Sequence, residues 1–241
     1  MLHINDLTFR MEGRLLLDHV TAALPPGQKI GFVGRNGTGK STLLKVITGE
    51  YVTETGGVSY PKNWRVGMVR QEVLAGPTSL IDTVLAADLE RASLLTEAET
   101  ATDPNRIAEI HTRLADMGAH AAPARAAEIL SGLGFDEAAQ ARPCADFSGG
   151  WRMRVALAAV LFSEPDLLLL DEPTNYLDLE GTIWLEAYLK TYPYTVLIVS
   201  HDRDLLNNVA EAILHLEHKK LTFYSGNYDR FDRTRREKLL L

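Results

Sequence analysis

The chain has 241 residues, 46% of them hydrophobic, which suits one sizeable α/β domain or one domain with a small satellite. Its formal net charge of −7 argues against a protein that coats nucleic acid over its whole surface, but leaves room for a local basic patch. The single cysteine, Cys144, excludes an internal disulfide, and the longest apolar run, residues 155–162, is too short for a membrane span, which needs about 20 residues.

The chain is predicted to begin with strands and turns. Short apolar segments lie at residues 3–10, 15–24 and 29–34, and a Pro-Pro-Gly-Gln sequence separates the last two. The opening residues lack the basic start and apolar core of a secretory signal. We therefore expect a soluble, cytoplasmic protein.

A glycine-rich motif follows the third of these strands. Residues 34–42, GRNGTGKST, fit the pattern G-x-x-x-x-G-K-[ST] and lead into a helical run that Gly49 is expected to end. Glycines let backbone N–H groups approach phosphate oxygens, and the helix N-terminus adds partial positive charge. Lys40 is expected to reach the β- and γ-phosphates, and Ser41 to hold Mg²⁺. The weaker alternative is a glycine-rich turn with a surface lysine. The candidate nucleotide-binding residues are Gly34, Arg35, Asn36, Gly37, Thr38, Gly39, Lys40, Ser41 and Thr42.

The character of the sequence changes after residue 75. Residues 79–99 have apolar side chains at helical spacing, and residues 103–117 begin with an Asp cap followed by Pro. These patterns predict a helical subdomain at about residues 76–164, inserted in an α/β core. Gln71 precedes it and is a candidate for the Mg²⁺ shell and for reporting the nucleotide to the helices; its alternative role is a polar strand end.

Ser148, Gly149 and Gly150 stand before an apolar helical run. Two interpretations remain open from these residues alone. Ser148 is either an ordinary N-cap with a tight entry turn, or part of a second anion cradle built from bare amides and a hydroxyl. Arg152 and Arg154 would then add positive charge to the cradle.

Residues 166–173 and 194–202 are apolar runs that end in polar residues, typical of parallel strands buried on both faces. Ligands bind at the carboxyl ends of such strands. Asp171 is placed to hold the Mg²⁺ water shell, and Glu172 to take a proton from an attacking water. His201 is placed to hydrogen-bond the γ-phosphate and that water. The alternatives are solvated acids at a strand end and a surface histidine.

The chain thus carries two anion cradles but one set of metal and base residues. In the simplest arrangement, the second anion-binding site contacts a nucleotide that is bound to a partner domain. Residues 212–226 are predicted to form a closing hairpin, and residues 227–241 a basic, helix-like segment. Because acidic residues interrupt its arginines, that segment is either an RNA contact or a solvated helix face.

The sequence resembles an ATP-binding cassette (ABC) domain over essentially the whole chain. The resemblance rests on the order and spacing of five elements: the motif at residues 34–42, Gln71, FSGGW, LLLLDEPTNYLD and VSHD. The resemblance implies an α/β P-loop NTPase fold with a RecA-like mixed sheet, an antiparallel β subdomain and an inserted helical subdomain. It implies ATP and Mg²⁺ as cofactors, and a head-to-tail pair of cassettes. Each ATP would lie between one P-loop and the other cassette's Ser-Gly-Gly signature. By matching position, the resemblance assigns the role of general base to Glu172 and a switch role to His201, Gln71 and Asp178. It assigns metal binding to Ser41, Gln71 and Asp171. It assigns contact with the partner cassette's ATP to Ser148, Gly149 and Gly150.

Within that family the chain resembles the ABC-F group of tandem-cassette ATPases that act in translation. The resemblance rests on FSGGWRMRVALA, DEPTNYLDLEGTIWLEAYL, SHDRDLLN and YSGNYDRF, and on Trp151, where transporter cassettes usually have glutamine. It implies one cassette at residues 1–226, the start of an inter-cassette linker at 227–241, a second cassette in a longer protein, and ATP-driven switching on the ribosome. The alternatives are the motor subunit of a membrane transporter and a nucleotide-binding module without turnover.

Two positions depart from the family pattern. Cassettes often stack adenine on an aromatic residue before the P-loop, but the corresponding place here is near Met11, with Phe9 two residues earlier. The sequence leaves open which of the two contacts the base. Tyr176 stands where ABC-F proteins commonly have histidine.

Overall fold

The computed structural model describes residues 1–70 and 75–240. The chain divides into two compact units. The first unit comprises Met1–Val69, Pro165–Asn175 and Thr182–Leu241, and the second comprises Arg70–Glu164 and Tyr176–Gly181. Gln71, a candidate metal and switch residue, lies outside the described residues.

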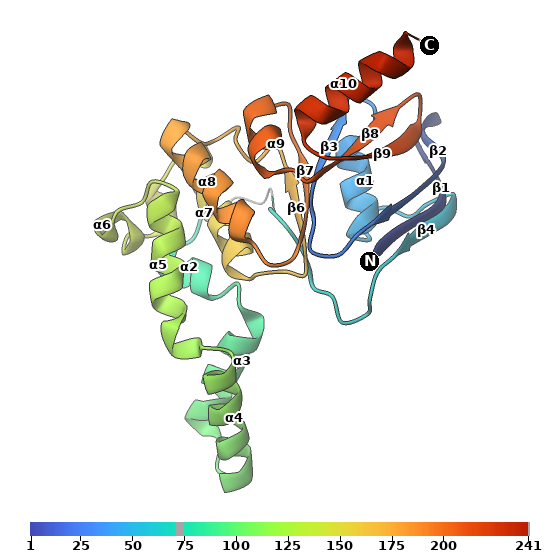
Figure 1. Ribbon diagram of the computed structural model, residues 1–241. Coiled ribbons are helices and arrows are strands. Elements are labelled where there is room, and N and C mark those ends of the chain that lie inside the picture. The colour runs from blue at the N-terminus through green and yellow to red at the C-terminus, as the bar shows by residue number, and fades with distance from the viewer. Residues whose placement is uncertain (71–74, 241) are drawn as a thin grey trace. The chain divides into compact units, whose positions relative to one another are not determined.

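A three-stranded antiparallel sheet opens the first unit, with the strand order β2-β1-β4 (Figure 1). Its strands are β1 (Leu2–Met11), β2 (Arg14–Leu24) and β4 (Thr55–Ser59). Glu12 and Gly13 join β1 to β2 with φ values of 49° and 81°, the pair of left-handed residues that a tight type I′ hairpin turn requires. Met11 and Arg14 therefore face each other across the turn.

A six-stranded sheet forms the centre of the first unit, in the order β5-β6-β7-β3-β8-β9. Neighbouring strands from β5 to β8 are parallel, and β8 and β9 form the predicted antiparallel hairpin. Every residue of β7 is buried, as expected for a strand with side chains covered on both faces. The strands are β3 (Lys29–Gly34), β5 (Val66–Met68), β6 (Leu167–Asp171), β7 (Thr195–Val199), β8 (Ala212–Glu217) and β9 (Lys220–Ser225).

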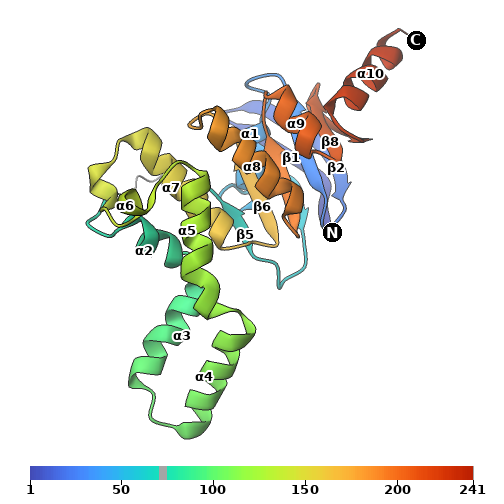
Figure 2. The ribbon, with the colours of Figure 1, turned by 60° about the vertical axis from the view of Figure 1, so that its left-hand side comes forward.

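Helices pack against this sheet (Figures 1 and 2). Helix α1 (Lys40–Ile47) contributes Leu43 and Leu44 to a core cluster that also draws side chains from both sheets. Helix α9 (Arg203–Val209) approaches closely at Gly31, where a Cβ would lie 2.7 Å from the Leu206 side chain. The remaining helices of this part of the chain are α8 (Leu179–Thr191) and α10 (Tyr228–Leu239).

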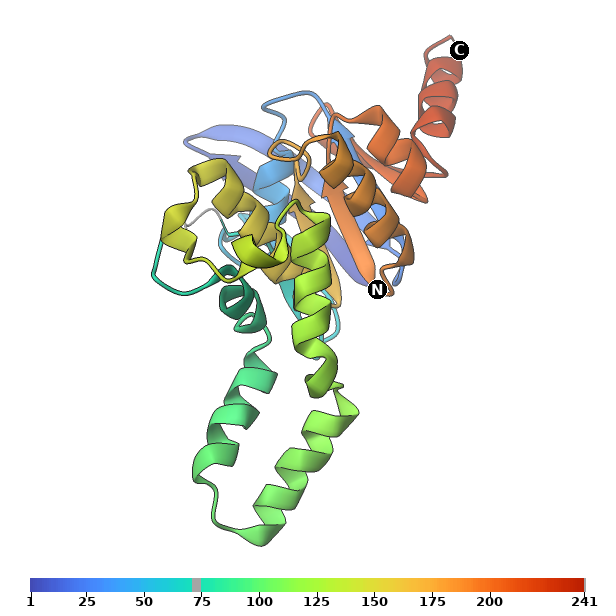
Figure 3. The same ribbon diagram turned by 90° about the vertical axis from the view of Figure 1, so that its left-hand side faces the viewer.

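The second unit is helical. Its predicted helical stretch at residues 79–99 is broken into α2 and α3, because Asp88 accepts a hydrogen bond from the Arg91 N–H and starts a new helix. Helices α3 and α4 run side by side, joined by ion pairs of Arg106 with Glu97 and of Arg113 with Glu90 (Figures 2 and 3). The helices are α2 (Leu80–Leu85), α3 (Leu89–Thr100), α4 (Pro104–Asp116), α5 (Ala122–Gly132), α6 (Glu137–Gln140) and α7 (Gly149–Phe162).

The predicted fold class is confirmed: a mainly parallel central sheet, a separate antiparallel sheet and a helical part within one chain. Over residues 1–70 and 75–240, no helix has both the length and the apolar character that crossing a membrane requires.

Candidate functional site

Three neighbouring parallel strands end at one edge of the six-stranded sheet. The register pairs Asp171 at the end of β6 with Val199 at the end of β7, and Val199 with Phe32 of β3. The glycine-rich motif follows β3, and His201 follows β7 by two residues. The topology therefore brings the predicted phosphate, metal and base residues to the same place, as the carboxyl ends of parallel strands must.

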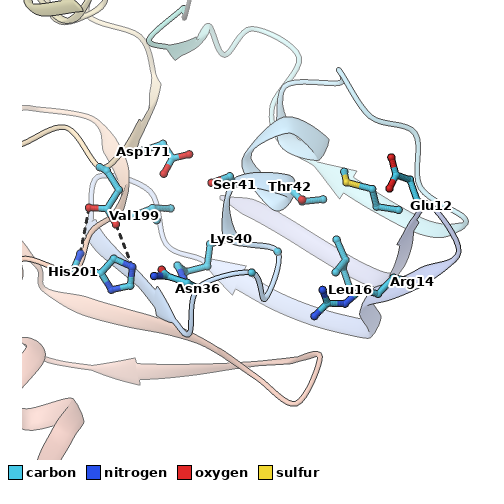
Figure 4. Close-up of a pocket in the computed structure, with 14 residues that line it drawn as sticks. Glu12, Arg14, Leu16, Asn36, Lys40, Ser41, Thr42, Asp171, Val199 and His201 are labelled. Carbon is cyan, nitrogen blue, oxygen red and sulfur yellow. Dashed lines mark hydrogen bonds and ion pairs between the residues drawn. The ribbon is translucent and has the colours of Figure 1, made fainter. Parts of the chain in front are cut away.

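A cavity of about 480 Å³ lies at this edge (Figure 4). Of the nine candidate nucleotide-binding residues, six line it: Asn36, Gly37, Gly39, Lys40, Ser41 and Thr42. The other three, Gly34, Arg35 and Thr38, do not line the cavity. Thr38 and Arg35 stabilise the loop from within, because the Thr38 hydroxyl donates to the Arg35 carbonyl at 2.6 Å.

Glycine is required within this loop for two physical reasons. Gly37 and Gly39 have φ values of 73° and 110°, which side chains rarely adopt. Gly34 approaches another strand so closely that a Cβ would lie 2.7 Å from the Leu216 carbonyl oxygen. Helix α1 starts directly after Gly39 without a side-chain cap, so the amides of its first turn are available to an anion.

Lys40 is held against the loop carbonyls. The residue is 6% exposed, and its Nζ donates to the Gly34 carbonyl at 2.7 Å and to the Arg35 carbonyl at 2.9 Å. An ammonium has three N–H donors, so one remains for a ligand. Burial lowers the pKa of Lys40 from its ordinary value, and the nearby carboxylates of Glu172 and Asp171 oppose that shift. The ammonium is thus pre-positioned at the cavity.

Glu172 and His201 contact each other directly (dashed lines in Figure 4). The His201 backbone N–H donates to Oε2 of Glu172 at 3.4 Å, and the His201 Nε2 lies 3.4 Å from Oε1. Glu172 has a left-handed φ of 48°, held by its N–H bond to the Val199 carbonyl at 2.8 Å. Such strain in a residue other than glycine is typical of functional sites. The carboxylate is 24% exposed and so can meet a water.

The oxygen ligands present suit Mg²⁺. Ser41 and Asp171 line the same cavity, and Gln71, the third predicted ligand, is outside the described residues. Within the described ranges no three His, Cys, Asp or Glu side chains gather in a metal-binding cluster. Mg²⁺ typically uses one or two protein oxygens together with phosphate oxygens and waters, so this sparse set fits an ion that arrives with a nucleotide.

The far end of the cavity is built by residues that the sequence patterns did not single out. Glu12, Arg14 and Leu16 line it together with Met11. Leu16 touches the phosphate loop, since a Cβ on Gly39 would lie 3.4 Å from it. The local sequence of a hairpin tip does not show what that tip packs against.

Phe9 and Met11, the two candidates for the adenine contact, differ in burial. Phe9 is 7% exposed and stacks on Tyr51 with ring centroids 5.6 Å apart, so its ring belongs to the core. Met11 lines the cavity. No Phe, Tyr or Trp is among the described residues that line this cavity.

Ser148, Gly149 and Gly150 belong to the second unit and begin α7. Ser148 has the extended backbone of an N-cap, but its side chain makes no capping hydrogen bond. Ser148 thus occupies the predicted N-cap position without the side-chain hydrogen bond that usually accompanies it. Its hydroxyl and the first amides of α7 remain available to an anion.

The two arginines after the signature do not simply add free charge there. Arg152 donates to the carbonyls of Cys144 and Ala145, each at 3.3 Å. Arg154 donates to two further carbonyls and is 8% exposed. Both guanidinium groups are engaged with backbone oxygens of their own unit.

Asp178 directly precedes α8. Its Oδ1 accepts a hydrogen bond from the Gly181 N–H at 2.8 Å, which is the geometry of a helix cap. This bond, with a smaller contribution from Arg154, holds the pKa of Asp178 below its usual range. The carboxylate therefore stays ionised and keeps the start of α8 in place.

Residues 17–175 match the protein family described as ABC transporter. The chain is 43% identical over 242 residues to a probable ATP-binding protein of Escherichia coli K12, YheS, covering 99% of this chain and 38% of YheS. It is 43% identical to human ATP-binding cassette sub-family F member 3, covering 94% of this chain and 33% of that protein. The chain thus spans less than two fifths of the length of these relatives.

Solved structures share the fold. The ATP-binding subunit of an ABC transporter superposes with a TM-score of 0.71 at 18% identity, covering 97% of this chain and 92% of that one. A dimeric ATP-binding cassette in a post-hydrolysis state, bound to ADP and Pi, gives a TM-score of 0.68 at 22% identity, covering 93% and 98%. At these identities the likeness concerns the fold.

Proposed function

Because the chain belongs to the ABC transporter family and is an ATP-binding cassette related to the F sub-family, we propose that it binds ATP with Mg²⁺ in the cavity at the sheet edge and hydrolyses it to ADP and phosphate. One observation carries the proposal. The phosphate loop, Asp171, Glu172 and His201 all line one cavity.

Each side chain has a distinct role in this proposal. Lys40 and the first amides of α1 hold the phosphates. Ser41 and Asp171, with Gln71, would hold Mg²⁺, which neutralises phosphate charge when bound. Glu172 accepts a proton from the attacking water, and His201 keeps that carboxylate and the water oriented.

The hairpin tip supplies the contact for the base. Met11 and Leu16 offer apolar surface, and Arg14 offers a planar guanidinium at the same end of the cavity. A thioether and a guanidinium both pack favourably on aromatic rings. We therefore assign adenine to Met11 rather than to Phe9.

Ser148, Gly149 and Gly150 are proposed to bind the ATP of a second cassette in the same full-length protein. This chain carries one set of metal and base residues, and its relatives are more than twice its length. Residues 1–226 are the proposed cassette, with a helical subdomain at about 76–164, and residues 227–241 begin the proposed linker. The Ser148 side chain makes no capping hydrogen bond, which supports the role of the signature as an anion-binding site.

The proposed cellular role is a nucleotide-driven switch on the ribosome, in the cytoplasm. Two curated relatives are F sub-family proteins, and α10 exposes Arg230 and Arg233, which suit an RNA backbone. The alternative is the motor subunit of a membrane transporter, which the family description and a transporter subunit of the same fold favour.

ATP binding and turnover by the full-length protein test the enzymatic part. We expect Lys40→Met to weaken ATP binding by at least about tenfold, because charge-assisted hydrogen bonds contribute about 1.5–3 kcal/mol each. Lys45→Met is the control, since Lys45 lies on the same helix but over the Tyr51 ring. Equal ATP affinity in the two variants would contradict the proposed phosphate site.

The cellular role is tested by co-sedimentation of the Glu172→Gln protein with ribosomes, with ATP and with ADP. ATP-dependent pelleting is the expected result. Pelleting with membranes in place of ribosomes would favour the transporter alternative. Binding to neither would overturn the ribosomal role and leave the ATPase assignment standing.

A further inference from the structure

Arg154 is a buried charge that makes an unusual set of contacts within the second unit. Its side chain is 10% exposed. Its Nε donates to the Tyr176 carbonyl at 2.7 Å, and its Nη1 donates to the Leu133 carbonyl at 3.1 Å and lies 3.7 Å from Oδ2 of Asp178. Burying a cation is costly unless its donors are satisfied, so this position requires the fork of an arginine.

The guanidinium is also fixed from its face. It stacks over the Trp151 ring at 4.1 Å, and Trp151 packs edge-on against Phe135 with centroids 5.2 Å apart. Gly134, at a φ of 99°, leaves room for both, because a Cβ there would lie 3.0 Å from Nη1 of Arg154 and 3.3 Å from the indole. Arg154 therefore has little freedom to turn away from its carbonyl partners.

These contacts reach a short segment, Tyr176–Gly181, which is grouped with the second unit. The segment begins four residues after Glu172 in the chain. It also lies beside the signature, since a Cβ on Gly150 would be 3.7 Å from the Tyr176 ring. Arg154 thus links α7, which begins at the signature residues, to the segment Tyr176–Gly181 that follows Glu172 in the chain.

We propose that Arg154 is a positioning residue for hydrolysis and that Trp151 holds it in place. Arg154 ties the segment Tyr176–Gly181 to helix α7, so that a ligand bound at Ser148–Gly150 determines the position of Glu172. The inference rests on the proposed ATPase function. Arg154 touches neither nucleotide nor water in this scheme and acts only through Glu172. Trp151 supports Arg154 indirectly: its indole stacks against the guanidinium and so limits the orientations that the guanidinium can adopt.

Arg154→Lys in the full-length protein is the principal test, because lysine keeps the charge but loses the fork. We expect single-turnover ATP hydrolysis to fall about tenfold or more, the scale of a misplaced catalytic group, with the Kd for ATP unchanged. Trp151→Gln, which removes the stacked indole but leaves the donors, is expected to lower the rate less. The control is Arg125→Lys, another stacked arginine of the second unit, over Phe162 and paired with Glu164; it is expected to hydrolyse at the wild-type rate.

A double variant separates positioning from a general structural role. If Arg154 acts through Glu172, then Arg154→Lys has no further effect on the residual hydrolysis of ATP bound at the P-loop of this chain once Glu172→Gln is present. A further fall in that background would overturn the inference. So would loss of folding or of ATP binding in both Arg154→Lys and Trp151→Gln, since the cluster would then be structural.

The two proposals fail in distinguishable ways. If the wild-type protein hydrolyses ATP and the Arg154→Lys variant hydrolyses it at the same rate, the inference is overturned and the ATPase function stands. A wild-type protein that does not hydrolyse ATP overturns the proposed function, and the positioning role with it.

Discussion

Glu172 combines a strained backbone with a restrained carboxylate. Its φ of 48° is unfavourable for a side chain with a Cβ, and the bond of its N–H to the Val199 carbonyl compensates for part of that cost. The same strand end brings the carboxylate against His201. With this backbone conformation the Glu172 side chain lines the cavity.

At this position we expect Glu172→Gln to keep ATP binding and to lower turnover by about 10²-fold or more, the low end for loss of a general base. Glutamine preserves the shape but cannot accept the proton. Single-turnover hydrolysis in the intact protein is the measurement, with Glu186→Gln as control, because Glu186 bonds to Asn208 on α9. An unchanged rate would falsify the base assignment.

Met11 allows the base contact to be separated from the phosphate contacts. We expect Met11→Ala to raise the Kd for ATP about fivefold, the factor that about 1 kcal/mol of lost apolar contact produces. The Kd for tripolyphosphate should stay at its wild-type value, because the phosphate loop is untouched. A matched change at Met68, on β5, is expected to affect neither ligand; equal losses for both ligands at Met11 would contradict the assignment.

At the scale of elements, α10 is packed onto the β8–β9 hairpin around His215. His215 is 8% exposed and its imidazole faces the Phe231 ring with centroids 5.0 Å apart, while Arg235 pairs with Glu217 at 2.6 Å. Burial lowers the pKa of His215 from its ordinary value of 6.5; Glu217 opposes the shift, and Arg235 and His218 reinforce it. The neutral ring is therefore part of the contact that holds α10.

The sign of the resulting pH dependence follows from the lowered pKa. Between the folded pKa and 6.5 the unfolded chain binds more protons at His215 than the folded chain does. The contribution to stability is complete above 6.5 and declines as the pH falls toward the folded pKa. We expect the urea midpoint of His215→Phe to vary less over this range than that of the wild type.

His111→Gln is the control for this measurement, since His111 is exposed on α4 in the other unit. Its midpoint should follow the wild-type curve. If His215→Phe also follows that curve, the contact between His215 and α10 does not depend on the protonation of the ring.

At the scale of the whole molecule, the proposed pairing of two cassettes predicts an effect in trans. On the proposed arrangement, turnover that persists in the full-length protein with Glu172→Gln is expected to come from the second nucleotide site. We expect Ser148→Arg to abolish that remaining turnover, because an arginine fills the cradle, while ATP binding at the P-loop of this chain persists. Ser131→Arg, exposed on α5, is expected to leave both unchanged. Loss of ATP binding at the P-loop of this chain would contradict the trans arrangement.

The sequence by itself indicated many of the local elements and the polar residue types at their ends. Strand β7, the glycine motif at residues 34–42 and the hairpin β8–β9 could be predicted because their periodicity and turn residues are local properties. The meeting of Asp171 and His201 at one edge also followed, since parallel strands end on the same side. The roles of these residues stay predictions until turnover is measured.

Only the tertiary structure decided which side chains meet across long stretches of chain. It placed Met11 and Arg14 at the cavity, and it committed Arg154 to carbonyls at Leu133 and Tyr176. It also left Ser148 without the capping bond that its type and position favour. Periodicity reports which face of an element is buried but not against what. The contacts that couple the signature helix to the segment after Glu172 therefore depend on packing between residues far apart in the sequence.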